Sequence, residues 1–198
     1  MKREDRSQRS QATRATLLEA GRELFSRRGY SNVGTEELVK HAGLTRGALY
    51  HHFRDKRDLF RAVFRQVEGE IVSEILAKIE DAGAEDPIEA LGVGIRSFLD
   101  VCEDPAKTQV GIVDAPAVLG WAEWREIGAE HGLSLVASAL QAAKDAGQVR
   151  HAEVQPLAHL MLAALGEAAM FVANAKDRAG ARREVEAALF TLLDSLRD

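Results

Sequence analysis

Cysteine and proline are scarce in this chain of 198 residues. A single cysteine, Cys102, excludes an internal disulfide and gives no grouped ligands for a metal site. It also fits a reducing compartment. With only four prolines and 46% hydrophobic residues, long stretches are free to form helix. The composition is therefore typical of a globular protein rich in helix.

Long hydrophobic runs are missing as well. No stretch approaches the roughly 18 uninterrupted apolar residues of a membrane-spanning helix. The basic segment 1–14 is not followed by the apolar segment of a signal peptide. We therefore expect a cytoplasmic protein with no membrane partner.

The sequence also lacks the patterns of common catalytic sites. It has no Gly-rich phosphate loop, no H-E-x-x-H, no G-x-S-x-G and no cysteine cluster. Glu36, Glu37 and His41 fall on one short predicted helix, where they serve better as cap and surface than as acid and base. We expect no catalytic residue, no metal and no cofactor. An enzyme built on a helical bundle is kept as an alternative.

Charge is divided unevenly along the chain, whose formal net charge is −5. Residues 1–60 contain 13 Lys and Arg against 8 Asp and Glu, whereas residues 61–198 contain 13 against 23. A basic head on an acidic body turns the head towards phosphates and keeps the body away from them. The asymmetry favours nucleic-acid binding, although a solvated surface can acquire it by chance.

The segment 35–56, TEELVKHAGLTRGALYHHFRDK, has the pattern of two short helices joined by a tight turn. A helix from about Ala12 precedes it, and Gly29 can stop that helix with a positive φ. Thr35 is expected to cap the second helix and Thr45 the third. Together these elements predict a three-helix head with a helix-turn-helix.

The N-terminal residues 1–11 are charged and polar, with no apolar residue after Met1. Such a composition buries too little apolar surface to order itself. We expect a disordered arm there.

The third predicted helix divides its residues between two faces. Leu49 and Phe53 point into the head. The opposite face carries the small and polar residues Arg46, Gly47, Tyr50 and His51. Arg46 can bind a guanine edge, Tyr50 can donate to a phosphate, and the smallness of Gly47 lets the helix sink into the major groove. Taken alone, Tyr50 would be interpreted as a half-buried aromatic residue and the two histidines as surface residues. Together, the residues of this face favour a helix that binds DNA.

The run from Gly29 to Phe60 resembles the tetracycline-repressor (TetR) family of transcriptional regulators. The likeness covers roughly residues 12–60 and rests on A-G-L-T at 42–45 and R-G-A-L-Y-H-H-F at 46–53, followed by Lys56. The resemblance implies a repressor that binds double-stranded DNA and is released by a small-molecule effector. The DNA contacts that it implies are Thr35, Thr45, Arg46, Gly47, Tyr50 and His51, with Lys56 on a phosphate.

The rest of the chain is predicted to form further helices. A long fourth helix runs to about Asp81, with apolar residues at three- and four-residue steps, and links the head to the body. Asp86-Pro87 and Asp104-Pro105 each mark a helix start. Glycines and Pro116 break the pattern between 110 and 120. The sequence predicts an all-α fold of about nine helices, with a DNA-binding domain at 1–57 and an effector-binding and dimerisation domain at 58–198.

The last two predicted helices indicate a second copy of the chain. Residues 157–173 are apolar on nearly every side, and residues 181–196 carry an apolar stripe. One short reading helix covers few base pairs, so a symmetric dimer on a palindromic operator doubles what is read. We expect a homodimer through these two helices.

An effector pocket would lie among the aromatic and Met residues of the body. The candidates are Phe98, Cys102, Trp121, Trp124, Met161, Leu165, Glu167, Met170 and Phe171. Possible polar anchors are His131, His159, Glu167 and Asn174. Residues of these types at helical spacing are core more often than pocket, so a regulator without an effector stays open. Gly128 and Gly132 would permit either a close helix crossing or a ligand.

Overall fold

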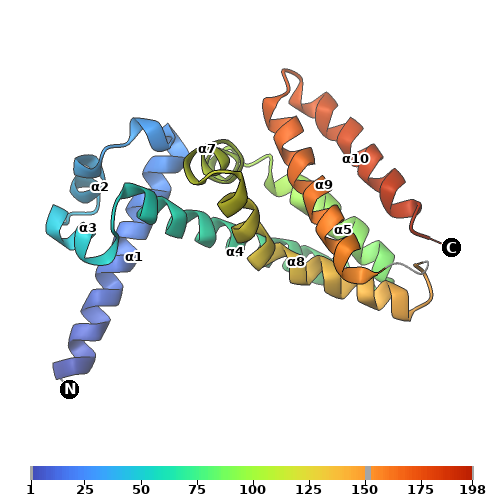
Figure 1. Cartoon of the computed structure of the whole chain (residues 1–198), viewed down its shortest axis with the longest axis horizontal. Coiled ribbons are helices and arrows are strands. Elements are labelled where there is room, and N and C mark those ends of the chain that lie inside the picture. Colours follow the sequence, from blue (N-terminus) through green and yellow to red (C-terminus); the bar gives the residue numbers. More distant parts are fainter. Residues whose placement is uncertain (1, 150–152, 198) are drawn as a thin grey trace.

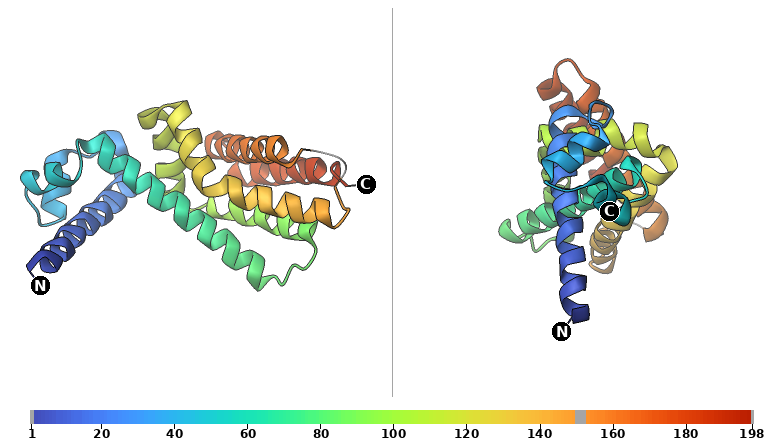
Figure 2. Two further views of the ribbon diagram at one scale, coloured as in Figure 1. Left: turned by 60° about the horizontal axis from the view of Figure 1, so that its bottom comes forward. Right: turned by 90° about the vertical axis from the view of Figure 1, so that its left-hand side faces the viewer.

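The computed structural model describes residues 2–149 and 153–197, which are almost entirely helical (Figure 1). The first three helices form a head at one end of the long helix α4, Lys56–Asp81. The remaining helices gather along the other part of α4 (Figure 2). Val149 and Arg197 form an isolated antiparallel bridge. The all-α class expected from the sequence is confirmed.

Helix α1 spans Lys2–Arg28, so it begins well before Ala12. The expectation of a disordered arm is therefore wrong for residues 2–11. These residues contain neither glycine nor proline and are rich in Lys, Arg and Gln, which favour helix, and a helix already formed propagates at little cost. In Figure 1 the N-terminal turns of α1 project beyond the rest of the head.

A short 3₁₀ turn, Tyr30–Asn32, joins α1 to α2, Thr35–His41, and the turn after it leads to α3, Arg46–His52. Gly29 and Gly43 have φ of 74° and 65°. A side chain at either position would strain the backbone, which is why glycine ends both helices.

The two predicted threonine caps have different outcomes. The Thr45 hydroxyl accepts a hydrogen bond from the Ala48 N–H at 3.2 Å, as a cap does. Thr35 is the first helical residue of α2, and Gly34 occupies the cap position without a side-chain bond. Thr35 is therefore not the cap that the sequence suggested, because the extended residue that precedes the helix is Gly34.

Helix α4 belongs to both the head and the body. The Asp55 carboxylate caps it by accepting a hydrogen bond from the Asp58 N–H at 2.7 Å. Phe60 packs edge-on against Phe25 and Tyr30, with ring centroids 5.3 and 5.1 Å away. The buried face of α4 then continues towards the body through Leu59, Phe60, Val63, Phe64, Val67, Ile71 and Ile75.

The first half of the body starts where the two Asp-Pro pairs predicted. Helix α5 spans Pro87–Val101 and α6 spans Pro105–Thr108. The Asp86 carboxylate accepts from the Glu89 N–H at 2.9 Å, and Asp104 accepts from the Ala106 N–H at 2.8 Å. Both starts are thus confirmed.

The predicted break between 110 and 120 is largely a continuation of helix. A π-helical turn η2, Gln109–Asp114, leads directly into α7, Ala115–Leu119, and Gly120 ends the segment with φ of 82°. A π turn accommodates Pro116, which has no N–H for an α-helical bond. With α6, η2 and α7 taken as one continuous helix, the described chain has nine helices.

The second half of the body contains the three long helices α8, Trp121–Asp145, α9, Val154–Asn174, and α10, Arg178–Asp194. Helices α9 and α10 lie side by side (Figure 1). The close crossing expected at Gly132 is present, since a Cβ there would lie 3.1 Å from the Leu162 side chain of α9.

Two hydrophobic clusters fill the interior. One runs without interruption from the head along α4 to Trp124 and Ile127 of α8. The other lies among α5, α8, α9 and α10. Because the first cluster crosses residue 57, the head and the body share one hydrophobic core.

Replacing Phe60 by alanine tests that connection. Phe60 is fully buried, so Phe60→Ala should lower the free energy of unfolding by about 3–5 kcal/mol through lost burial and a cavity. Urea unfolding at a fixed protein concentration measures this change. The matched control is Val113→Ala, at an apolar residue of η2 that is 48% exposed, which should change stability by less than about 0.5 kcal/mol. Equal effects of the two substitutions would contradict the packing described.

Candidate functional site

Helix α3 presents its predicted reading residues on one exposed face. Leu49 is fully buried and Phe53 nearly so, which fixes the opposite side of the helix against the head. The residues of the exposed face are Thr45, Arg46, Gly47, Tyr50 and His51. Only the Thr45 side chain comes within 4 Å of where a Gly47 Cβ would lie, so this part of the helix is open to a partner.

Two weak contacts orient the Arg46 side chain on this face. Its Nη1 donates to Glu36 Oε1 at 2.8 Å, and its guanidinium lies 5.8 Å from the Tyr50 ring centroid. Hydrogen bonding to Tyr50 and then the charge of Glu36 raise the pKa of Arg46, so the guanidinium remains charged. Both partners of the ion pair are mostly exposed, and such pairs are worth little. Arg46 can therefore exchange Glu36 for another acceptor at small cost.

Lys56 has a structural role at the start of α4. Its ammonium donates to the backbone oxygens of Tyr30 and Val33 at 3.0 and 2.9 Å and lies 3.8 Å from the Tyr30 ring centroid. Burial lowers the pKa of Lys56, and the nearby Asp114 opposes that shift. A lysine ammonium has three donors, so one remains for a phosphate. The Thr35 hydroxyl has no hydrogen-bond partner among the residues described.

The body contacts the head at Tyr30 and at the start of α4. Asp114, the last residue of η2, accepts a hydrogen bond from the Tyr30 N–H at 2.8 Å. Arg57 donates to the backbone oxygens of Val118 and Leu119 at 3.1 and 3.0 Å and pairs with Glu123 at 2.7 Å. No sequence pattern pointed to Asp114, because it lies in the segment that was expected to break the helix.

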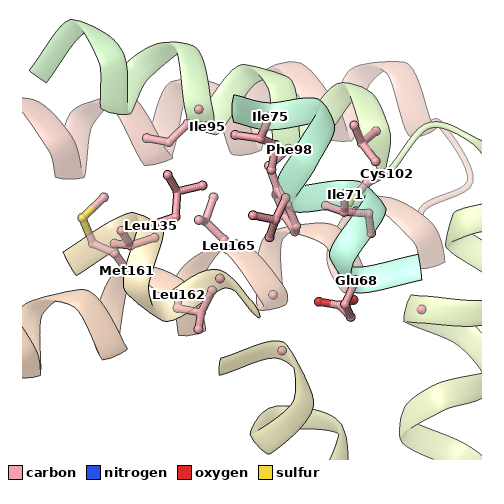
Figure 3. Close-up of a pocket in the computed structure, with 18 of the residues that line it drawn as sticks. Glu68, Ile71, Ile75, Ile95, Phe98, Cys102, Leu135, Met161, Leu162 and Leu165 are labelled. Carbon is pink, nitrogen blue, oxygen red and sulfur yellow. The ribbon is translucent and has the colours of Figure 1, made fainter. Parts of the chain in front are cut away.

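The body contains a cavity of about 250 Å³ lined mainly by α4, α5, α8 and α9, with Gly111 and Ile112 of η2 also in its wall (Figure 3). Trp124 Nε1 donates to the Gly111 backbone oxygen at 2.9 Å and fixes η2 against α8. The wall is mostly aliphatic and aromatic. Among its residues are Ile71, Ile75, Ile95, Phe98, Leu135, Met161 and Leu165.

The predicted pocket residues fall into two groups. Those that line the cavity are Phe98, Cys102, Trp124, Met161 and Leu165. Those that do not are Trp121, Glu167, Met170 and Phe171. Trp121 and Phe171 are more than half exposed, Met170 packs against the first hydrophobic cluster, and Glu167 is exposed on the outer side of α9. The reason is helical phase, since apolar residues at helical spacing do not reveal which side of their helix faces the cavity.

The polar anchors expected from the sequence are also misplaced. His159 and Asn174 are exposed on α9, like Glu167, and His131 is not part of the cavity wall. The carboxylate that does line the cavity is Glu68 of α4 (Figure 3). The sequence carried a signal for it: Glu68 stands four residues after Phe64 and three before Ile71, inside the apolar stripe of α4.

Glu68 sits between two glycines from different elements. Its Oε1 lies 3.8 Å from where a Cβ of Gly111 would be, and its Oε2 lies 3.8 Å from the corresponding point at Gly128. Burial raises the pKa of Glu68 to about 7, and no neighbouring charge contributes to that shift. Gly128 therefore lies beside a carboxylate, at a distance where a Cβ would make an ordinary van der Waals contact.

The outer faces of α9 and α10 expose large apolar side chains among polar ones in the single chain. Leu160 and Phe171 of α9 are 68% and 54% exposed, and Leu192 of α10 is 57% exposed. By length and composition α9 alone among the described helices is apolar enough to cross a bilayer, with 28% of the tested window buried in the chain. Exposed patches of this kind mark a surface that something else covers.

Two family models match the chain. "Bacterial regulatory proteins, tetR family" matches residues 17–63, which include the helix-turn-helix. "Tetracyclin repressor-like, C-terminal domain" matches residues 88–196, more than half of the chain. The head and the body are thus each similar to the corresponding part of this family.

Relatives agree over the full length. The TetC protein of transposon Tn10 from Escherichia coli is 26% identical over 187 residues, which cover 94% of this chain and 93% of that protein. The structure of a TetR-family transcriptional regulator from Pectobacterium atrosepticum is 34% identical, with a TM-score of 0.84 and 96% of both chains covered. RolR bound to resorcinol shares the fold at 20% identity, with a TM-score of 0.75, covering 94% of this chain and 89% of RolR. With the exposed face of α3, these matches identify the chain as a member of the TetR family, a DNA-binding transcriptional regulator and not an enzyme.

Proposed function

We propose that this chain represses transcription as a cytoplasmic homodimer on a palindromic operator and leaves the DNA when a small molecule fills the cavity. Residues 1–57 bind DNA, and residues 58–198 bind the effector and dimerise. The observation that carries the proposal is the position of η2. Gly111 lies at the cavity, and Asp114, three residues further on, holds the head through Tyr30.

Recognition of DNA is assigned to the exposed face of α3. Arg46 binds a guanine edge after leaving Glu36, and the Tyr50 hydroxyl donates to a phosphate. Gly47 leaves space for the groove wall. The remaining contacts are proposed for Thr35, Thr45, His51 and the third donor of Lys56.

Two variants separate base reading from phosphate contact. Arg46→Ala should weaken the free energy of binding to the operator by about 1–3 kcal/mol. On operators already altered at the base pair that Arg46 reads in each half-site, the same substitution should change binding very little. Tyr50→Phe, which removes only the hydroxyl, should weaken binding to all sequences by a similar factor. Fluorescence anisotropy on an operator selected from random DNA measures both effects.

Arg65→Ala is the matched control, because it removes an arginine of α4 that pairs with Glu130 away from the head. Wild-type affinity and base preference in Arg46→Ala and Tyr50→Phe would contradict the assignment of α3 as the reader.

Dimerisation is assigned to the outer faces of α9 and α10. Leu160, Glu167, Phe171 and Asn174 follow one another at steps of seven, four and three residues, so they share one side of α9. Ionisable and amide groups on that side are costly in lipid but find partners in a protein interface. A second copy therefore covers this surface better than a membrane does.

Charges placed on this surface should separate the copies. Leu160→Glu with Phe171→Glu should convert the protein to a folded monomer and weaken operator binding by at least about tenfold, because half of the phosphate and base contacts are lost. Light scattering after gel filtration gives the mass. The control Leu76→Glu, at an apolar residue of α4 that is 48% exposed, should remain dimeric. A dimer that survives the double substitution would exclude this interface.

Release of DNA is assigned to strain at the junction. A molecule in the cavity contacts both η2 and α4, and these two elements bind the Tyr30 N–H and carbonyl oxygen through Asp114 and Lys56. A coupling free energy of about 1–3 kcal/mol between cavity and DNA is typical of such systems. Among solved relatives, RolR was crystallised with resorcinol, which supports a small molecule as the effector class.

A screen of small apolar compounds tests this mechanism. Compounds that raise the melting temperature should also weaken operator binding by about 5- to 150-fold. In Asp114→Ala the same compounds should still bind, but their effect on DNA affinity should shrink. If compounds bind the cavity and none weakens the DNA complex, the protein is a regulator without an effector.

A further inference from the structure

We propose that the cavity is selective for a cationic amphiphile, a molecule with one apolar body and one protonated amine that pairs with the Glu68 carboxylate. The inference rests on the proposed function, since it names the class of the effector. It also specifies an orientation, with the amine beside Glu68 and the apolar body towards Met161 and Ile95 (Figure 3).

The first argument is that Glu68 has no partner. Acidic residues on the helices around the cavity, which are not part of its wall, are paired: Glu70 with Arg22, Glu74 with Lys107, and Asp100 with Arg182. For Glu68 the described residues offer neither a hydrogen bond nor an ion pair. Burying a carboxylate without a partner costs desolvation free energy. A cation or hydrogen-bond donor that reaches the carboxylate offsets this penalty.

The second argument is the space around the carboxylate. Gly111 and Gly128 face its two oxygens from η2 and α8, and the cavity opens beside it. An alanine at either position would fill part of this space. The chain thus supplies a charged group, room next to it and an apolar chamber beyond it, which together match a molecule of opposite charge and mixed polarity.

The third argument concerns the other charged and titratable groups nearby. Lys107 lines the cavity, but its ammonium contacts both oxygens of Glu74 at 2.6 Å. Burial raises the pKa of Cys102 to about 12, so its thiol is neutral. His131 of α8 lies beside Gly69, and burial together with Arg65 lowers its pKa, which leaves it largely uncharged at neutral pH.

Arg125 of α8 is the remaining cation in the wall, and it marks the competing possibility of an anionic ligand. Its guanidinium makes no contribution to the Glu68 pKa, so the two groups act separately. Arg125 also lies near Gly166 on α9, where it keeps some exposure to solvent. Glu68 is also partly exposed, but its two oxygens face Gly111 and Gly128, and burial raises its pKa to about 7, so a cation that reaches Glu68 stabilises its ionised form.

Three compounds with the same apolar body test the charge preference: 4-phenylbutylamine, 4-phenylbutan-1-ol and 4-phenylbutyrate. Calorimetric titration of the full-length protein at pH 8 should give the tightest binding for the amine, and the acid should bind most weakly. Glu68→Gln should weaken binding of the amine by about ten- to a hundredfold, because a charge-assisted hydrogen bond is lost. Binding of the alcohol should change little, because the shape of the cavity is kept. The control Glu80→Gln replaces an exposed carboxylate of the same helix and should leave the affinities for the amine and the alcohol unchanged.

A pH series on the unaltered chain gives a second test that needs no variant. With a carboxyl pKa of about 7, binding of the amine should tighten about tenfold from pH 6 to pH 8, because the cation binds the ionised form. The amine stays protonated over this range, and binding of the alcohol should stay nearly constant. An amine affinity independent of both pH and Glu68→Gln would overturn the proposal, as would preferred binding of the acid or failure of all three compounds to bind.

Measuring operator affinity with each compound separates the two proposals. If the amine binds through Glu68 and leaves DNA affinity unchanged, the ligand class stands and regulation by the cavity fails. If the alcohol or the acid binds better and releases DNA, regulation stands and the cationic class fails.

Discussion

The two hydrogen bonds on the backbone of Tyr30 are the contact on which the rest of the structure depends. Asp114 of the body holds its N–H, and Lys56 of α4 holds its carbonyl oxygen. The bend between α1 and α2 is thereby fixed from two sides, and with it the direction in which α3 presents its exposed face. A body that moved either partner would therefore move the exposed face of α3 without contacting it.

The cavity shares its walls with that contact. Helix α4 carries Lys56 at its first residue and Glu68, Ile71 and Ile75 at the cavity, while η2 carries Gly111 at the cavity and Asp114 at its end. Buried side chains are close-packed, so a ligand that displaces one wall displaces what is attached to it. Binding and release of DNA can be linked by this geometry without a separate relay.

Local patterns predicted the head well. The Thr45 cap, the positive φ at Gly29 and Gly43, and the division of α3 into buried Leu49 and exposed Arg46 depend on residues within a few positions of each other. The same reasoning failed at residues 2–11, where polarity was taken for disorder although helix propensity was high. It also failed at 110–120, where glycine and proline were taken for a break and the chain forms a π turn instead.

The sequence by itself determined most of the helices, the caps at Thr45, Asp86 and Asp104, and which face of α3 is exposed, because helix formation and amphipathic phase are set by neighbouring residues. Only the tertiary structure decided which side of α9 faces the cavity, that Glu68 and not Glu167 is the carboxylate in its wall, and that Asp114 reaches Tyr30. These facts depend on helix crossings between residues as far apart as Glu68 and Gly128. Such contacts are fixed by the packing of whole helices, which no local pattern records.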